Sequence, residues 1–319
     1  MGPAFINTFF NNSSTVSVRR QSRPQSPQRR APETANFGLQ TSPDKEPAGM
    51  SVISRLPQIT ALFWAMKIAA TTFGETGGDS LSMSLDLGYA EATLLFFSIL
   101  AVCLFFQLRA RRFQPALFWA AIAATVLMGT TLADFIDRGP GDDVGTSGGL
   151  GYVGGMAVAF SGLILVFVIW RASGRSFDIQ KIVTRRAEVL FWIAILLSNT
   201  MGTALGDYLA DELGLGFWRS GVLIAILMVL VMIVHYTTRV SPVLLFWIGF
   251  VLTRPLGTVL GNYLSKSHFK GGLELGNYGT TFVIGVVLVI GIGYSYFRIH
   301  QAKSSTPMEL EPEPGAAAA

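Results

Sequence analysis

Three ionisable residues, Lys67, Glu75 and Arg254, stand inside long stretches of otherwise apolar sequence. A charge held away from water needs a partner, so such groups generally pair with one another or line the path of a solute. Glu75 is the acid placed deepest in an apolar stretch, and Arg254 is its expected partner. Two interpretations stay open, a structural ion pair that joins two helices and an ionisable site in a transport path.

A second polar set recurs four times along the chain. Its members are Asp79, Asp134, Asp207 and Asn262, which follow Glu75, Thr130, Thr203 and Thr258, respectively, by four positions. The last three members lie about 20 residues beyond the expected start of their helices, a rise of ~30 Å that reaches the outer membrane interface. At that depth they can be solvated or turn the chain, or they can form a ring of ligands at a pore mouth.

These two sets do not determine the sign of a bound solute. The three outer aspartates together with Glu75 suit a cation by charge complementarity, and oxygen ligands favour a hard cation. Lys67 and Arg254 can equally hold a small carboxylate or phosphate. The identity of any metal ion is not determined.

The pair Phe-Trp recurs at 63/64, 118/119, 191/192 and 246/247 and marks an internal repeat. Trp64 and Trp119 are 55 residues apart, as are Trp192 and Trp247, and the two halves are offset by 128 residues. Counted from each Trp, positions +3, +7, +11 and +15 form a slowly winding stripe, because four residues advance only about 40° beyond one full turn. The first and fourth stripes carry Lys67, Glu75 and Arg254.

Small residues stand at positions +10 and +14 of every repeat. The glycines among them are Gly74, Gly78, Gly129, Gly202, Gly206, Gly257 and Gly261, and Ala133 takes +14 in the second repeat. Two small residues four apart share one helix face and let helix backbones approach closely. We therefore expect these glycines to pack the first helices of the repeats against one another, and the Phe-Trp pairs to be packing anchors.

The elements that position these residues are membrane-spanning helices. The chain of 319 residues is 50% hydrophobic and 14% charged, with a mean hydropathy of +0.47, which indicates a membrane protein. Eight continuous apolar stretches are each long enough, at about 20 residues, to cross a bilayer as a helix. They begin near Leu56, Tyr89, Pro115, Tyr152, Ala187, Trp218, Pro242 and Tyr278. The only cysteine, Cys103, excludes disulfides within the chain.

Each repeat crosses the membrane twice, so all four repeats share one orientation. Eleven Lys and Arg residues follow the even-numbered spans, which predicts an inner membrane protein with both termini cytoplasmic. The expected repeats cover approximately 56–112, 113–175, 182–239 and 240–300 of a membrane domain at 50–300. Residues 1–49, rich in Ser, Pro, Gln and Arg, and residues 301–319 are expected to be disordered tails.

The stretch "FWAMKIAATTFGETGGD" at 63–79 resembles a family of bacterial membrane proteins built of four tandem two-helix repeats of unknown function, each with a characteristic tryptophan. The resemblance implies the fold and brings no functional residues. We therefore predict an all-α membrane protein, a pseudo-fourfold bundle with the first helix of each repeat inside.

The function that these patterns favour is transport of a small solute or cation through a polar cleft lined by those first helices. The alternative is a membrane scaffold or assembly factor that transports nothing. No nucleophile elbow or phosphate loop occurs in the sequence, so we expect neither enzymatic activity nor a cofactor. The expected partners are the lipid bilayer and a small polar or ionic cargo, and the topology explains the net charge of +4 without nucleic acid. The oligomeric state is not determined.

Overall fold

The computed structural model describes residues 57, 59–110, 113–140, 148–174, 177–178, 182 and 184–304. All of them belong to the second of two compact parts of the chain, residues 54–319. The expected tail at 1–49 lies outside the described residues, as does most of the expected tail at 301–319.

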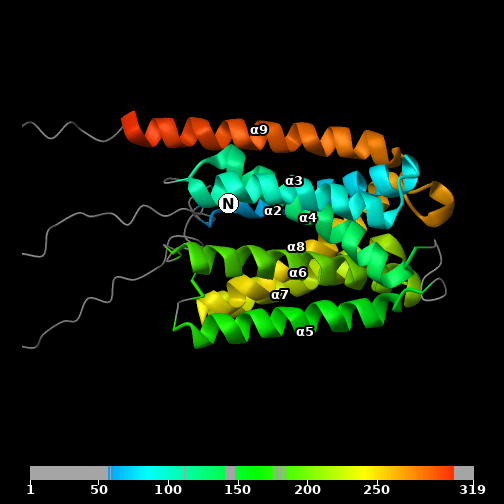
Figure 1. Cartoon of the computed structure of the whole chain (residues 1–319), viewed down its shortest axis with the longest axis horizontal. Helices are drawn as coiled ribbons and strands as arrows, with labels where there is room; N and C mark the ends of the chain where they lie inside the picture. The colour runs from blue at the N-terminus through cyan, green and yellow to red at the C-terminus, as the bar shows by residue number, and fades with distance from the viewer. Residues whose placement is uncertain are drawn as a thin grey trace, which may run out of the picture. The chain divides into compact units, whose positions relative to one another are not determined.

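The described residues form eight long α-helices, as predicted (Figure 1). They are α2 (Ala61–Asp79), α3 (Tyr89–Arg109), α4 (Pro115–Arg138), α5 (Gly151–Ala172), α6 (Arg185–Asp207), α7 (Gly216–Thr237), α8 (Pro242–Ser265) and α9 (Gly276–Ser304). Helix α2 begins later than the expected start near Leu56, and α9 continues into the first residues of the expected C-terminal tail. Three short helical segments follow α2, α6 and α8: η1 (Ser80–Ser84), η3 (Tyr208–Glu212) and η4 (His268–Lys270).

The helix ends of the first and third repeats share one set of features, and those of the second and fourth repeats share another. In the first and third repeats, Thr60 and Thr184 cap the N-termini of α2 and α6 by accepting hydrogen bonds from Phe63 N and Ala187 N. Both helices continue into a π-helical turn. In the second and fourth repeats, Pro115 and Pro242 instead start α4 and α8.

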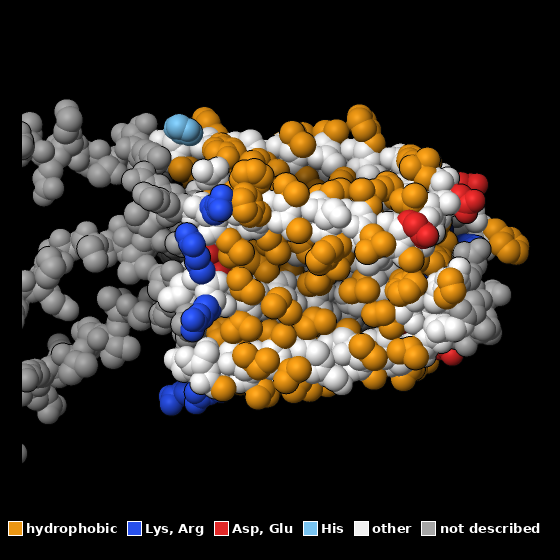
Figure 2. Space-filling view, viewed as in Figure 1, with side chains coloured by type: hydrophobic (Ala, Val, Ile, Leu, Met, Phe, Trp, Pro, Cys, Tyr) orange, Lys and Arg blue, Asp and Glu red, His pale blue; other side chains and the backbone are white. Residues whose placement is uncertain are grey.

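Seven of these helices, α3 to α9, are long and apolar enough to cross a membrane, which makes the chain a multi-pass membrane protein. Helix α2, for which the sequence also predicted a span, does not reach the same hydropathy. Its Lys67, Glu75 and threonines lower the average, and α4, α8 and α9 pack around it. In Figure 2, hydrophobic side chains cover the visible face between an end with Lys and Arg and an end with Asp and Glu.

The first helices of the four repeats form the inner ring of the bundle. Helices α2, α4, α6 and α8 contact one another in a closed cycle, and each outer helix packs chiefly on the inner helix of the following repeat. Thus α3 packs on α4, α5 on α6 and α7 on α8, while α9 packs on α2 and closes the ring. The predicted pseudo-fourfold arrangement, with the first helices inside, is confirmed.

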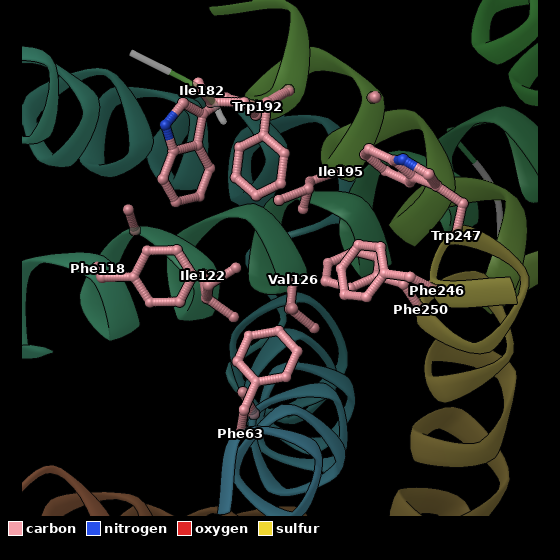
Figure 3. Close-up of a cluster of buried hydrophobic side chains, with 14 of the residues drawn as sticks. Phe63, Phe118, Ile122, Val126, Ile182, Trp192, Ile195, Phe246, Trp247 and Phe250 are labelled. Atoms are coloured by element: carbon pink, nitrogen blue, oxygen red, sulfur yellow. The ribbon is translucent and has the colours of Figure 1, made fainter. Parts of the chain in front are cut away.

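The Phe-Trp pairs form a ring of aromatic contacts between neighbouring inner helices. Each Phe contacts the Trp of the next repeat, and Phe246 of the last repeat contacts Trp64 of the first. The centroid distances are 5.8 Å for Phe63–Trp119, 5.7 Å for Phe118–Trp192, 6.2 Å for Phe191–Trp247 and 5.8 Å for Phe246–Trp64. Figure 3 shows several of these rings packed with Ile122, Val126 and Ile195. Such contacts stabilise a dry helix interface beyond the burial of area alone.

Candidate functional site

The four polar stripes converge on a common line between the inner helices, which we name the polar axis. Its sixteen side chains are each at most 5% exposed. Four levels follow along the axis: the Lys67 level (Lys67, Ile122, Ile195, Phe250), the Arg254 level (Thr71, Val126, Asn199, Arg254), the Glu75 level (Glu75, Thr130, Thr203, Thr258) and the outer level (Asp79, Asp134, Asp207, Asn262). Hydrogen bonds join residues of the same or adjacent levels, so the inner helices run in the same direction.

The glycines at +10 hold this arrangement by receiving the +7 side chain of the next repeat. A Cβ atom added to Gly74 would lie 2.1 Å from Val126 Cγ1, and one added to Gly202 would lie 2.6 Å from Arg254 Cβ. The same relation joins Gly129 to Asn199 and Gly257 to Thr71. These four glycines therefore allow close helix packing, as small-residue patches predict. Each one packs against the inner helix of the next repeat in the ring.

The glycines at +14 receive the +11 side chain of the next repeat. An added Cβ would lie 3.0 Å from Thr130 Cβ at Gly78, 2.8 Å from Thr258 Cγ2 at Gly206, and 3.0 Å from Glu75 Cβ at Gly261. The small residues thus let side chains of the Arg254 level and of the Glu75 level pack directly against the backbone of the neighbouring inner helix.

Arg254 lies at the centre of the axis and is fully buried. Its Nη2 donates to Glu75 Oε2 at 3.1 Å and to the hydroxyls of Thr130 and Thr203, and its Nη1 donates to the Thr71 carbonyl oxygen at 3.1 Å. One guanidinium on α8 therefore contacts α2, α4 and α6. The ion pair expected from the register of the repeats is present.

Glu75 accepts more than this one ion pair. Thr258 Oγ1 donates to Glu75 Oε2 and Asn262 Nδ2 to Glu75 Oε1, both at 3.1 Å. Asn262 Nδ2 also lies 3.2 Å from Asp207 Oδ1, so one amide joins two carboxylates from different repeats. Glu75 and Asp207 are both satisfied by donors of the chain itself.

The outer level is buried, and two of its aspartates are ion-paired, so the expectation of simple solvation does not hold. Lys266 Nζ lies 2.6 Å from Asp79 Oδ2, and Arg138 Nε lies 3.4 Å from Asp134 Oδ1. Burial disfavours the Lys266 ammonium, but the neighbouring Asp79 carboxylate outweighs it and raises the pKa of Lys266 above its ordinary value.

The sequence interpretation did not identify Arg138 and Lys266 as partners of the outer aspartates. The spacing of four residues between Asp134 and Arg138 is a helical ion-pair signal and could have indicated the first pair. No comparable signal links Lys266 to Asp79, because the two residues come from opposite ends of the chain and meet only when the ring closes.

Lys67 differs from the other ionisable groups of the axis. It is fully buried, and in the described part of the chain no carboxylate lies within ion-pair distance of its ammonium. Nζ donates to Asn199 Oδ1 at a long 3.5 Å and lies 4.4 Å from the centroid of the Phe250 ring. The Asn199 amide is in turn held by Thr125, to which its Nδ2 donates at 3.3 Å.

All ten candidate cargo-binding residues thus lie on the polar axis, and all seven candidate packing glycines lie where neighbouring inner helices meet. At these levels the axis is occupied by buried side chains of the chain itself, where the sequence interpretation expected a polar cleft.

Comparison with known proteins agrees with this architecture. A model of the Repeat of Unknown Function (DUF347) matches residues 62–113, 117–176, 190–241 and 245–300. No curated protein and no solved structure matches the chain. The four matched segments coincide with the four helix pairs of the ring and cover more than half of the chain, and the protein therefore belongs to the DUF347 repeat family.

Proposed function

We propose that this protein transports a small polar or ionic solute across the membrane along the polar axis. The observation that supports the proposal is the convergence of Lys67, Glu75 and Arg254, all fully or almost fully buried, on a line between four parallel helices. An ionisable group near the centre of a bilayer costs at least about 2.5–3.5 kcal/mol on insertion scales. A helix bundle with a purely structural role does not require buried charges, because apolar side chains of similar volume stabilise a core equally well.

The filled axis favours a transporter over an open pore. Arg254, Thr130, Thr203 and Glu75 hydrogen-bond across the ring and block passage at that level. Solute movement then requires the inner helices to separate, as in transporters built from repeats that rock against one another. The seams between repeats, where glycines meet the next helix, are the surfaces on which such a movement takes place.

The alternative, a scaffold that transports nothing, is favoured by the completeness of the Arg254 and Glu75 network. Solute uptake by vesicles distinguishes the two functions. We expect vesicles that contain the purified full chain to take up at least one small solute from a panel of inorganic ions, small carboxylates and neutral metabolites. Glu75→Gln should abolish that uptake, because the amide carries no charge and cannot exchange a proton.

The matched control for this variant is Glu91→Gln, which makes the same change at an exposed position on α3. Thermal unfolding in detergent confirms that each variant is folded before uptake is compared. Wild-type uptake equal to that of protein-free vesicles across the whole panel would support the scaffold, and full uptake by folded Glu75→Gln would remove Glu75 from the path.

We further propose that the protein lies in a bacterial inner membrane with both termini in the cytoplasm. Basic residues near the helix ends support this orientation, since cytoplasmic connections retain Lys and Arg. Arg109 and Arg171, at the ends of α3 and α5, belong to the basic end. A fluorescent reporter fused to the C-terminus should be active, whereas a phosphatase that requires the periplasm should be inactive there. The reverse pattern would contradict the orientation.

A further inference from the structure

Among the described residues, two ionisable positions of the polar axis have no oppositely charged partner within ion-pair distance, Asp207 and Lys67. Glu75 pairs with Arg254, Asp79 with Lys266 and Asp134 with Arg138, and Asp207 accepts a hydrogen bond from Asn262. Lys67 is left with an amide oxygen and an aromatic face. A cation–π contact and one long hydrogen bond do not replace a counterion for a desolvated ammonium.

Unused hydrogen-bond donors occur at the Lys67 level and at the adjacent Arg254 level. An ammonium has three N–H groups, and the described acceptors of Lys67 amount to Asn199 Oδ1. Arg254 lies one turn beyond Phe250 on α8, and its buried Nε has no hydrogen-bond partner. The Lys67 and Arg254 levels therefore hold two fully buried cationic side chains with donors to spare. Arg254 pairs with Glu75 of the next level, whereas Lys67 has no carboxylate within ion-pair distance in the described part of the chain.

We propose that Lys67, Arg254 and Asn199 form an anion-binding site and that the solute carried along the axis is a small monovalent anion. The proposal rests on the transport function proposed above and adds the sign of the cargo. Lys67 supplies the charge that attracts the anion, Arg254 Nε supplies a second donor, and the amide of Asn199 orients the ammonium. The anion occupies the place of the missing carboxylate while the inner helices are separated.

A cation is the poorer fit, although the number of acids on the axis first suggests one. Asp79 and Asp134 are each neutralised by a basic side chain at 2.6 and 3.4 Å, and Glu75 by Arg254 at 3.1 Å. A cation bound to Asp79, Asp134 or Glu75 would have to displace one of these partners. Asp207, which has only the Asn262 amide, lies at the outer level, away from the centre of the axis. An anion at Lys67 displaces no charged partner.

The test uses the full chain in vesicles of phosphatidylcholine and phosphatidylglycerol. Efflux of chloride, nitrate and formate is measured beside that of sodium and potassium, for wild type and for Lys67→Met and Lys67→Arg. We expect wild type to release at least one of the anions. Lys67→Met should fall to the level of protein-free vesicles, and Lys67→Arg should retain part of the flux because it keeps the charge.

The control variant is Arg171→Met, which removes a cation from the exposed end of α5 and should leave the flux unchanged. Lys67→Met should also fold at least as stably as wild type, because it replaces an uncompensated buried charge by an apolar chain of similar length. A large loss of stability in Lys67→Met would show that the ammonium is structural and would overturn the proposal.

A second measurement separates this inference from the transport function. In detergent, chloride, nitrate or formate should raise the melting temperature of wild type above that in gluconate at equal ionic strength, and Lys67→Met should abolish the difference. Flux of cations alone, unaffected by Lys67→Met, would retain transport and overturn the anion site. An anion-dependent shift that requires Lys67, without flux of any probe, would retain the site and overturn transport. Absence of both would overturn both.

Discussion

Replacing Glu75 with alanine should destabilise the protein by about 3–5 kcal/mol, because it leaves the Arg254 guanidinium buried without a carboxylate. Arg254 is fully buried and, among the described residues, retains as acceptors the hydroxyls of Thr130 and Thr203 and the Thr71 carbonyl. A guanidinium cannot relieve this cost by losing its proton at accessible pH. Thermal or denaturant unfolding in detergent measures the change.

Arg254→Ala removes the opposite charge and should show a smaller electrostatic cost. Glu75 keeps the donors Thr258 and Asn262 and can also take up a proton. The double variant should recover much of the loss, since no unpaired charge remains. Lys270→Ala, at an exposed position in η4, is the control and should be close to neutral. Strictly additive losses in the double variant would show that the two residues do not stabilise each other.

Replacing Gly257 with alanine should cost about 3 kcal/mol, the upper range for inserting a methyl group into a packed core. The added Cβ would lie 2.4 Å from Thr71 Cβ and 2.7 Å from the Thr71 backbone carbon, so α2 and α8 must move apart. A backbone atom cannot turn aside as a side chain can. The separation should also weaken the hydrogen bond from Thr71 Oγ1 to the Thr253 carbonyl oxygen, now 3.1 Å.

The matched control is Gly293→Ala on the outer helix α9, where an added Cβ meets nothing within 4 Å. That variant should be neutral or slightly stabilising, because alanine is favoured over glycine in a helix by up to about 1 kcal/mol. The two variants make the same chemical change, so the difference between their melting temperatures isolates the helix contact. Equal melting temperatures would show that the inner ring is loosely packed at this seam.

Several features of the fold are encoded locally and could be predicted from the sequence. Apolar stretches of about 20 residues define the helices, and the Phe-Trp spacing defines the repeats. The polar stripe shows which face of each first helix is turned inward, since charges avoid lipid. The pairing of Glu75 with Arg254 followed from the register of two repeats in a closed ring.

Other features are decided only where helices from distant parts of the chain meet. The order of the ring places each +10 glycine against the +7 side chain of the next repeat, and it brings Lys266 of the last repeat to Asp79 of the first. The outer aspartates are buried because neighbouring helices cover positions that hydropathy alone describes as solvated, and Asp79 and Asp134 find basic partners there.

By itself the sequence therefore determined the eight helices, the four repeats and the polar faces, because helical periodicity and hydropathy are properties of contiguous residues. Apart from Glu75 and Arg254, whose pairing the repeat register predicted, the tertiary structure decided which charges find partners. Lys67 has the same kind of sequence context as Glu75 and Arg254, yet the ring sets it beside Phe250 and Asn199 and gives it no carboxylate in the described part of the chain. The physical reason is the short range of the interaction. An ion pair forms only when the charged ends of two side chains lie a few ångströms apart, and that distance depends on how whole helices pack.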